Sequence, residues 1–128
     1  MNLNTALKVS STGLSVERFK MDIISSNIAN ANSMKIGNKM PYRRHTVDVT
    51  GDENGVQISG ISQDQAPFRM VSEPGNPNAD ASGMVTYSNI EPINEMVNMM
   101  SASRAYEANI AAFNSAKGMI KDALTIGK

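Results

Sequence analysis

The apolar residues near the start of the chain recur at the spacing of a long helix. One stripe repeats at roughly the heptad interval between residues 3 and 31. Its members are Leu3, Leu7, Leu14, Met21 and Ile28. Asn2 and Asn4 can both cap free backbone N–H groups, so we predict a helix that begins at one of them and ends near Ala31. At about 1.5 Å per residue this helix is roughly 43 Å long.

A second apolar stripe lies on the opposite side of the same predicted helix, roughly 160–180° away if each residue advances by about 100°. It consists of Val9, Val16, Phe19 and Ile23. A surface helix of a monomeric protein needs only one apolar face. We therefore predict that the second stripe contacts neighbouring subunits of an assembly, and that Val16→Asp blocks that assembly.

The end of the chain repeats this arrangement. We predict a helix that starts between Asn89 and Pro92, because proline fits only the first turn, and that ends near Ile126 before Gly127. The side predicted to pair with the first helix carries Met99, Tyr106, Ile110, Phe113, Ile120 and Leu124. Much of the other side, predicted to contact neighbouring subunits, carries Ala105, Ala112, Met119 and Ile126.

The first stripes of the two helices are predicted to seal against each other as an antiparallel, coiled-coil-like hairpin. If both termini lie at one end, Gly13 faces Gly118 and Leu7 faces Leu124. Each glycine costs about 1 kcal/mol of helix stability against alanine. Two glycines at one level would let the backbones approach closely or would form a hinge.

The middle of the chain holds short alternating runs between turn signals. Residues 46–49 and 56–59 flank a turn at 51–55 and predict a β-hairpin. Residues 68–71 and 84–87 predict two further strands. We therefore predict a mainly α fold with a small, irregular β region: an N-terminal helix in residues 1–34, a small β-rich outer region in residues 35–88, and a C-terminal helix in residues 89–128.

Charge is distributed in blocks although the net charge is zero. Residues 1–45 carry seven Lys/Arg against two acids, residues 46–95 one against eight, and residues 96–128 four against two. Such blocks suit head-to-tail matching between copies or sister proteins, or form ordinary solvated surface. No apolar run approaches the roughly 20 residues of a membrane span.

No combination of residues indicates catalysis or a metal site. The chain has no cysteine and a single histidine, His45, which excludes a thiolate or two-histidine metal site. We predict that the protein is not an enzyme and takes no cofactor and no small-molecule substrate. The best case for nucleic acid is the basic cluster Lys35, Lys39, Arg43 and Arg44. Its charge is too sparse for such a footprint, so we predict no nucleic-acid partner.

Two stretches make the chain resemble a known family. The run SNIANANS at residues 26–33 is similar to the N-terminal motif of bacterial flagellar rod, hook and hook-associated proteins, and EMVNMMSASRAYEANIAAFNSAKGM at residues 95–119 resembles their C-terminal motif. Within this axial family, YRRHTV at residues 42–47 and EPGNPNADASGMV at residues 73–85 resemble the proximal rod subunit. The positions that match the family motif are Asn27, Ala29, Asn30, Ala31, Arg104, Tyr106, Glu107 and Asn109.

The resemblance implies a structural subunit of the rod, the drive shaft of the flagellar basal body that spans the periplasm. The terminal helices would form an axial core domain and the middle an outer layer. Its implied partners are further copies of itself, sister rod subunits, other basal-body proteins and the flagellar type III export apparatus. The N-terminal residues lack the apolar core of a secretory signal peptide, which agrees with that route. The alternative is a soluble helical adaptor protein that binds a partner helix.

Overall fold

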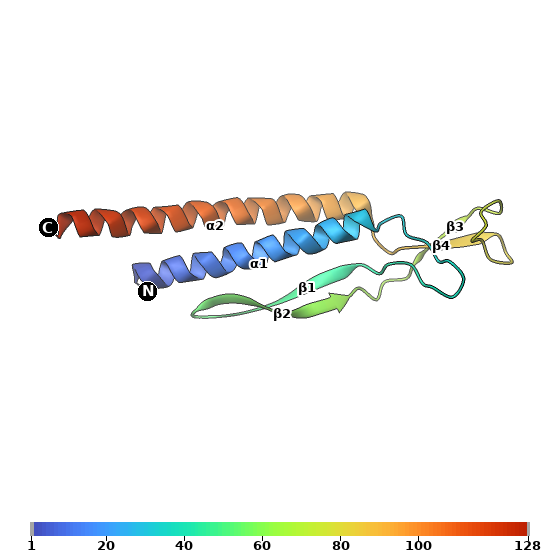
Figure 1. Cartoon of the computed structure of the whole chain (residues 1–128), viewed down its shortest axis with the longest axis horizontal. Coiled ribbons are helices and arrows are strands. Elements are labelled where there is room, and N and C mark those ends of the chain that lie inside the picture. Colours follow the sequence, from blue (N-terminus) through green and yellow to red (C-terminus); the bar gives the residue numbers. More distant parts are fainter. Residues whose placement is uncertain (1, 128) are drawn as a thin grey trace.

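Two long helices lie side by side in the computed structural model, which describes residues 2–127 (Figure 1). Helix α1 spans Leu3–Ala29 and helix α2 spans Pro92–Ile126. The two chain ends lie at the same end of this pair, so the helices are antiparallel (Figure 1). Between them in sequence are two small antiparallel sheets. The predicted fold, mainly α with a small β region, is confirmed.

Local signals in the sequence account for the helix ends. Asn2 caps α1, because its Oδ1 accepts a hydrogen bond from the Thr5 backbone N–H at 2.7 Å. Helix α2 begins with Pro92 in the first turn, as predicted, and Glu91 occupies the capping position. No helix in the described part of the chain is long and apolar enough to cross a membrane.

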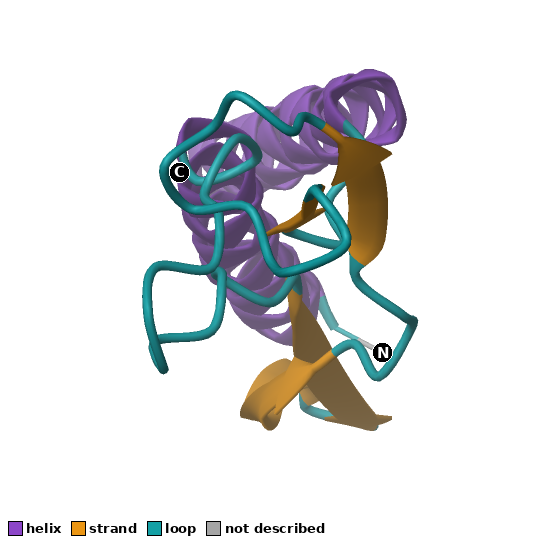
Figure 2. Cartoon of the chain, turned by 90° about the vertical axis from the view of Figure 1, so that its right-hand side faces the viewer, coloured by secondary structure: helices purple, strands orange, loops and turns teal. Residues whose placement is uncertain are grey.

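The strands form two separate hairpin-like pairs. Strand β1 (His45–Asp52) pairs with β2 (Gly55–Gln63), with an irregularity in register between Asp48 and Val49. Strand β3 (Arg69–Ser72) pairs with β4 (Met84–Tyr87). The predicted β-hairpin and the two further strands are thus confirmed. The β1–β2 hairpin runs alongside α1, whereas β3 and β4 project beyond the helices (Figures 1 and 2).

The fully buried side chains are few and mostly small. The apolar ones are Val16, Ala31, Pro41, Val85, Ile90, Ala102 and Ala116, and the polar ones are Asn27, Ser88 and Glu95. Most of these lie along the contact between the helices or at the junction where the helices meet the strands. The chain therefore has a narrow core for its length, and much of its apolar surface remains exposed.

Candidate functional site

The contact between α1 and α2 has a different register from the predicted one. A Cβ atom built on Gly13 would lie 2.9 Å from Asn109 Oδ1, whereas one built on Gly118 would have no such neighbour within 4 Å. Gly13 therefore faces Asn109, and the predicted Gly13–Gly118 pairing is wrong by about nine residues, or roughly 13 Å along the axis. The end of α1 and the start of α2 lie at the same level. Because α2 is longer, its far end extends beyond the start of α1 (Figure 1).

This overhang exposes residues at the end of α2. Leu124 is 67% exposed and lies at the step where α1 begins, beside Leu3 and Ala6. The predicted pairing of Leu124 with Leu7 is therefore wrong. Ile110 is 37% exposed, so its side chain is only partly covered within the chain. The other residues predicted to pair are at least partly buried: Leu7, Leu14, Met21, Ile28, Met99, Tyr106, Phe113 and Ile120.

The closest packing of α2 uses small residues that the hydrophobic pattern missed. Ala102 and Ala116 are only 5% and 6% exposed. Alanines at these positions let the two helix backbones approach closely, and their spacing of two heptads places them on one face. A search for small residues on the predicted pairing face would have found them.

The second stripe of α1 lies against the β1–β2 hairpin. The Val56 backbone N–H donates to Thr12 Oγ1 at 3.1 Å, and a Cβ atom on Gly55 would overlap that oxygen. Val16 lies on this side of α1, between Thr12 and Asn27, and is 4% exposed. Val16 is therefore covered within the chain itself, and its contact with a neighbouring subunit stays a prediction.

The rest of that stripe is also partly covered. Val9, Phe19 and Ile23 are half-buried within the single chain. Ile23 lines a groove of about 420 Å³ between α1, β1 and α2, and Ala105 lies on the α2 side of the same groove. The apolar surface that the sequence placed on both helices is thus concentrated on α2.

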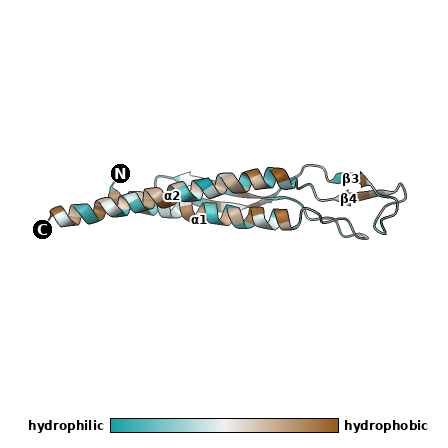
Figure 3. Cartoon of the chain, turned by 90° about the horizontal axis from the view of Figure 1, so that it is seen from above, coloured by the Kyte–Doolittle hydropathy of each residue, from teal (hydrophilic) through white to brown (hydrophobic). Residues whose placement is uncertain are grey.

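The outer face of α2 remains uncovered by the rest of the described chain. Near the start of α2, four apolar side chains at helical spacing are 51–75% exposed. We call them the outer stripe: Ile93, Met96, Val97 and Met100. Figure 3 shows apolar positions at this end of α2, close to β3 and β4. The predicted intersubunit residues do not include this stripe, because they lie at a different heptad position, that of Ala105 and Ala112.

The predicted intersubunit residues on α2 differ in exposure. Met119 is 57% exposed and Ile126 is 85% exposed. Ala112 is exposed and Ala105 is half-buried. Exposed apolar side chains therefore occur near both ends of α2, as the outer stripe near its start and as Met119 and Ile126 near its end. Exposed apolar surface on this scale is typical of a protein–protein contact.

A buried polar junction holds the helices and the hairpin together. Asn27 Nδ2 donates to the His45 carbonyl at 2.9 Å and to Glu95 Oε2 at 3.1 Å, while Asn27 Oδ1 accepts from the His45 N–H at 3.0 Å. Arg44 Nε donates to the other oxygen of Glu95, which is 1% exposed. Asn27, one of the family-motif positions, therefore links α1 to β1 and to α2 through its side-chain amide.

The electrostatics of the junction favour the charged forms of Arg44 and Asp64. Burial alone lowers the pKa of Arg44, but the hydrogen bonds and charges of Glu95 and Asp64 outweigh it and raise the pKa above its usual value. The Ala66 backbone N–H, which donates to Asp64 Oδ1 at 2.9 Å, lowers the pKa of Asp64, and Arg44 lowers it further. The junction is therefore a stabilising network rather than a proton-transfer site.

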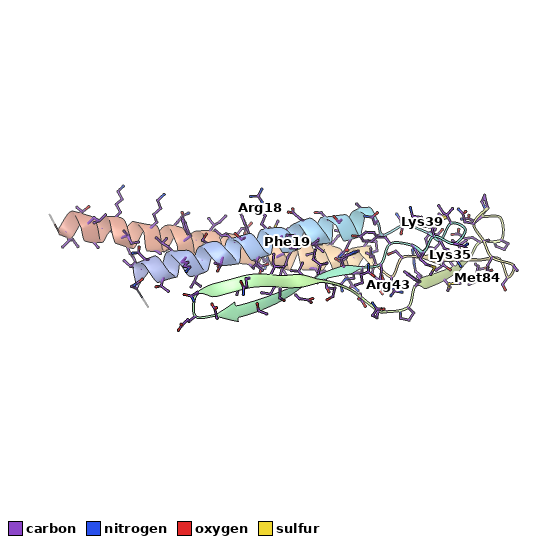
Figure 4. The ribbon with its side chains drawn as sticks, turned by 60° about the horizontal axis from the view of Figure 1, so that its bottom comes forward. Arg18, Phe19, Lys35, Lys39, Arg43 and Met84 are labelled. Carbon is purple, nitrogen blue, oxygen red and sulfur yellow. The ribbon has the colours of Figure 1, made fainter. Side chains whose placement is uncertain are left out.

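The basic cluster considered for nucleic acid does not form one surface. Arg43 donates to the carbonyls of Asp64 and Ala66 and stacks over the Phe68 ring, 4.2 Å from its centroid. Arg44 is held by Glu95 and Asp64. Lys35 and Lys39 lie further out, in the segment near β3 and β4 (Figure 4).

The described residues offer no metal site. No group of three or more His, Cys, Asp or Glu side chains in residues 2–127 is arranged to hold a metal ion. His45 stacks on Tyr42, with ring centroids 4.7 Å apart, and its Nδ1 is buried without a hydrogen-bond partner in the same residues. The histidine thus serves packing at the junction.

Comparison with known proteins gives a consistent family assignment. Residues 7–33 match a family model described as flagella basal body rod protein, and residues 81–126 match one described as flagellar basal body rod FlgEFG protein C-terminal. The chain is 37% identical to flagellar basal-body rod protein FlgC of Bacillus subtilis, over 96% of this chain and 97% of that protein. FlgC of Salmonella typhimurium is 37% identical over the whole of both chains, and FlgC of Borreliella burgdorferi is 34% identical over 98% of each.

Proposed function

The chain belongs to the family of flagellar basal-body rod proteins named FlgC, and on this premise we propose that it polymerises with sister subunits into the proximal part of the helical shaft that transmits torque for motility. It is a structural subunit of the rod and not an enzyme, and it is located in the flagellar basal body with other rod components.

The observation that carries this proposal is the uncovered apolar face of α2. Ile93 and Ile126, at opposite ends of the helix, are 75% and 85% exposed. Burial of apolar area stabilises a contact by about 25 cal/mol per Å². Contacts that do not close into a ring extend into a helical shaft, which is the form that a rod requires.

We propose that the terminal segments and the middle of the chain have different roles in the rod. Residues 1–34 and 89–128 form the axial core domain, and residues 35–88 form the outer region. The position of β3 and β4 beyond the helices supports the outer role for that part (Figure 1). The β1–β2 hairpin serves the core domain by covering α1, so α2 supplies the main contacts with neighbours through Ala112, Met119, Ile126 and the outer stripe.

We also propose that the chain travels to the rod through the flagellar type III export apparatus. The narrow core supports this, because a chain with few fully buried side chains unfolds readily for passage. Its proposed partners are further copies of the same chain, sister rod subunits and other basal-body proteins.

The test replaces the gene in the source bacterium with an Ile93→Asp/Met100→Asp variant. Both side chains are exposed, so the purified variant keeps its circular dichroism spectrum, while cells build no rods and do not swim in soft agar. Gln57→Asp, on the exposed side of the hairpin, is the matched control and leaves motility intact. Swimming cells with normal rods in the double variant, or in a strain without the gene, would support the adaptor alternative.

A further inference from the structure

We propose that Met96 and Met100 form a redox-sensitive pair, and that oxidation of their thioethers to sulfoxides by a peroxide keeps the free chain out of the rod. This inference rests on the proposed rod function and adds a chemical control over the outer stripe. The two residues are one helical turn apart on the same side of α2. They supply half of the side chains of the stripe, so a change in their polarity changes the stripe as a whole.

The exposure of the methionine side chains differs along α2. Met96 is 52% exposed and Met100 is 58% exposed. Met99, which lies between them in sequence, is half-buried. Reaction with a small oxidant in water requires access to the sulfur atom. The two methionines of the outer stripe are therefore open to oxidation, whereas their neighbour is shielded by the fold.

The sulfur lone pairs of the two residues are also free of hydrogen bonds from the described residues. Elsewhere in the chain, Met34 Sδ accepts hydrogen bonds from two asparagine side chains, at 3.9 and 3.4 Å. Met70 Sδ accepts one from Thr86 Oγ1 at 3.1 Å. A lone pair that accepts a hydrogen bond is less available as a nucleophile. Met96 and Met100 thus combine an exposed side chain with an unengaged sulfur.

The reaction needs only the peroxide as a co-reactant. A sulfur lone pair attacks one oxygen of hydrogen peroxide, so that an S–O bond forms while the O–O bond breaks. The hydroxide that leaves takes the proton from the sulfur-bound oxygen and becomes water. The sulfur is oxidised by two electrons, which the peroxide accepts. A methionine sulfoxide reductase reverses the change: the oxygen leaves as water, and two thiols are oxidised to a disulfide.

Oxidation makes the outer stripe unfit for an apolar contact. A thioether is flexible and apolar and fits irregular partner surfaces, whereas a sulfoxide is polar. Its oxygen accepts hydrogen bonds, and burying it without a donor is unfavourable. The other members of the stripe, Ile93 and Val97, have no side-chain donor to offer. The oxidised chain therefore binds neighbouring subunits less tightly, while its own fold, which leaves both methionines exposed, is unchanged.

Timed oxidation of the purified chain tests the reactivity of the pair. We expect tandem mass spectrometry to show that Met96 and Met100 gain oxygen several-fold faster than Met99 in the folded chain, and at the same rate as Met99 in urea. The circular dichroism spectrum is expected to be the same before and after the reaction. Equal rates at the three positions in the folded chain would overturn the proposal.

Leucine tests the effect on assembly, because it is apolar and does not react with peroxide. In each strain, expression of the chain is induced with or without sublethal hydrogen peroxide, and the ratio of new rods under the two conditions is measured. The ratio is expected to be several-fold higher for Met96→Leu/Met100→Leu than for the parent.

Met40→Leu/Met70→Leu is the matched control, since it removes two methionines that lie outside the stripe and are 52% and 48% exposed. We expect this control to be as sensitive to peroxide as the parent. Equal ratios for the two double variants would overturn the proposed switch.

Glutamine imitates the sulfoxide, since it places a polar oxygen at the end of an unbranched side chain. Met96→Gln/Met100→Gln is expected to build no rods even without peroxide, and normal rods in this variant would overturn the proposal. That failure is separate from failure of the rod function, which would instead appear as normal rods in cells that lack the chain.

Discussion

The Asn27 side chain pairs with the backbone of His45 in both directions, as one strand residue pairs with another. Its amide nitrogen donates at 2.9 Å and its amide oxygen accepts at 3.0 Å. The second proton of the same nitrogen reaches Glu95 at 3.1 Å. One buried amide therefore joins α1, the first strand and α2, and it sets both the position of the hairpin and the level of the two helices.

Replacing this amide by a hydrocarbon of similar size is expected to destabilise the whole chain. Asn27→Leu leaves the His45 backbone groups and a buried Glu95 oxygen unpaired, at a cost of about 1–3 kcal/mol for each unsatisfied group. We expect the free energy of unfolding in urea to fall by about 3 kcal/mol. Asn32→Leu, at an exposed position after the helix, is the control. A loss no larger than that of the control would contradict the role of Asn27.

The observed register predicts opposite effects at the two helical glycines. Gly118→Ala is expected to raise the free energy of unfolding by about 1 kcal/mol, because alanine favours the helix and meets open space. Gly13→Ala gains the same propensity but pushes Asn109 away from its hydrogen bond with the Ala105 carbonyl. The change in the free energy of unfolding is therefore expected to be about 1–3 kcal/mol less favourable for Gly13→Ala than for Gly118→Ala.

A double-mutant cycle isolates that contact. In an Asn109→Ala background the side chain that Gly13 accommodates is gone, so Gly13→Ala is expected to become stabilising. Urea denaturation of the four proteins gives the coupling energy. Equal effects of Gly13→Ala in both backgrounds would show that Gly13 does not face Asn109.

Burial separates two positions that the sequence had treated alike. Val16→Asp places a carboxylate in an enclosed apolar site and is expected to cost several kcal/mol, about 3 or more, of the isolated chain's stability. Met119→Asp lies at an exposed site and is expected to change stability by less than about 0.5 kcal/mol. Thermal unfolding of the two purified variants checks this. A stable Val16→Asp protein would mean that the hairpin does not cover α1.

The junction makes stability depend on pH in the acid range. Hydrogen bonding from the Ala66 N–H and then Arg44 lower the pKa of Asp64 in the folded chain below its ordinary value of 3.8. Its stabilising contribution is thus complete well above pH 3.8 and is lost as the pH falls through the folded-state pKa.

We expect Asp64→Asn to be less stable than the parent chain at pH 7 and closer to it at pH 3. Asparagine keeps the acceptor for Ala66 but loses the charge that pairs with Arg44. Urea unfolding at the two pH values measures the difference. A gap between parent and variant that widens at pH 3 would contradict this assignment.

Much of the architecture was predictable because it depends on local signals. The Asn2 cap, Pro92 in the first turn of α2 and the two pairs of strands all follow from nearby residues. The register between α1 and α2 could not be predicted in this way. The apolar pattern is satisfied equally well if the start of α1 is level with the end of α2, or if the end of α1 is level with the start of α2. The buried polar side chains of Asn27 and Glu95 select the register, because their hydrogen-bond partners lie far away in sequence.

By itself, the sequence determined that two amphipathic helices pair and that more apolar surface is present than one pairing can bury. Helical periodicity and local propensity are properties of short stretches, so no tertiary information was needed. Only the tertiary structure decided which helix carries the apolar surface that stays exposed. Val16 on α1 is buried within the chain, while Ile93 and Met100 on α2 stay exposed. Which face is covered depends on hydrogen bonds between distant residues, and no periodicity along the chain records them.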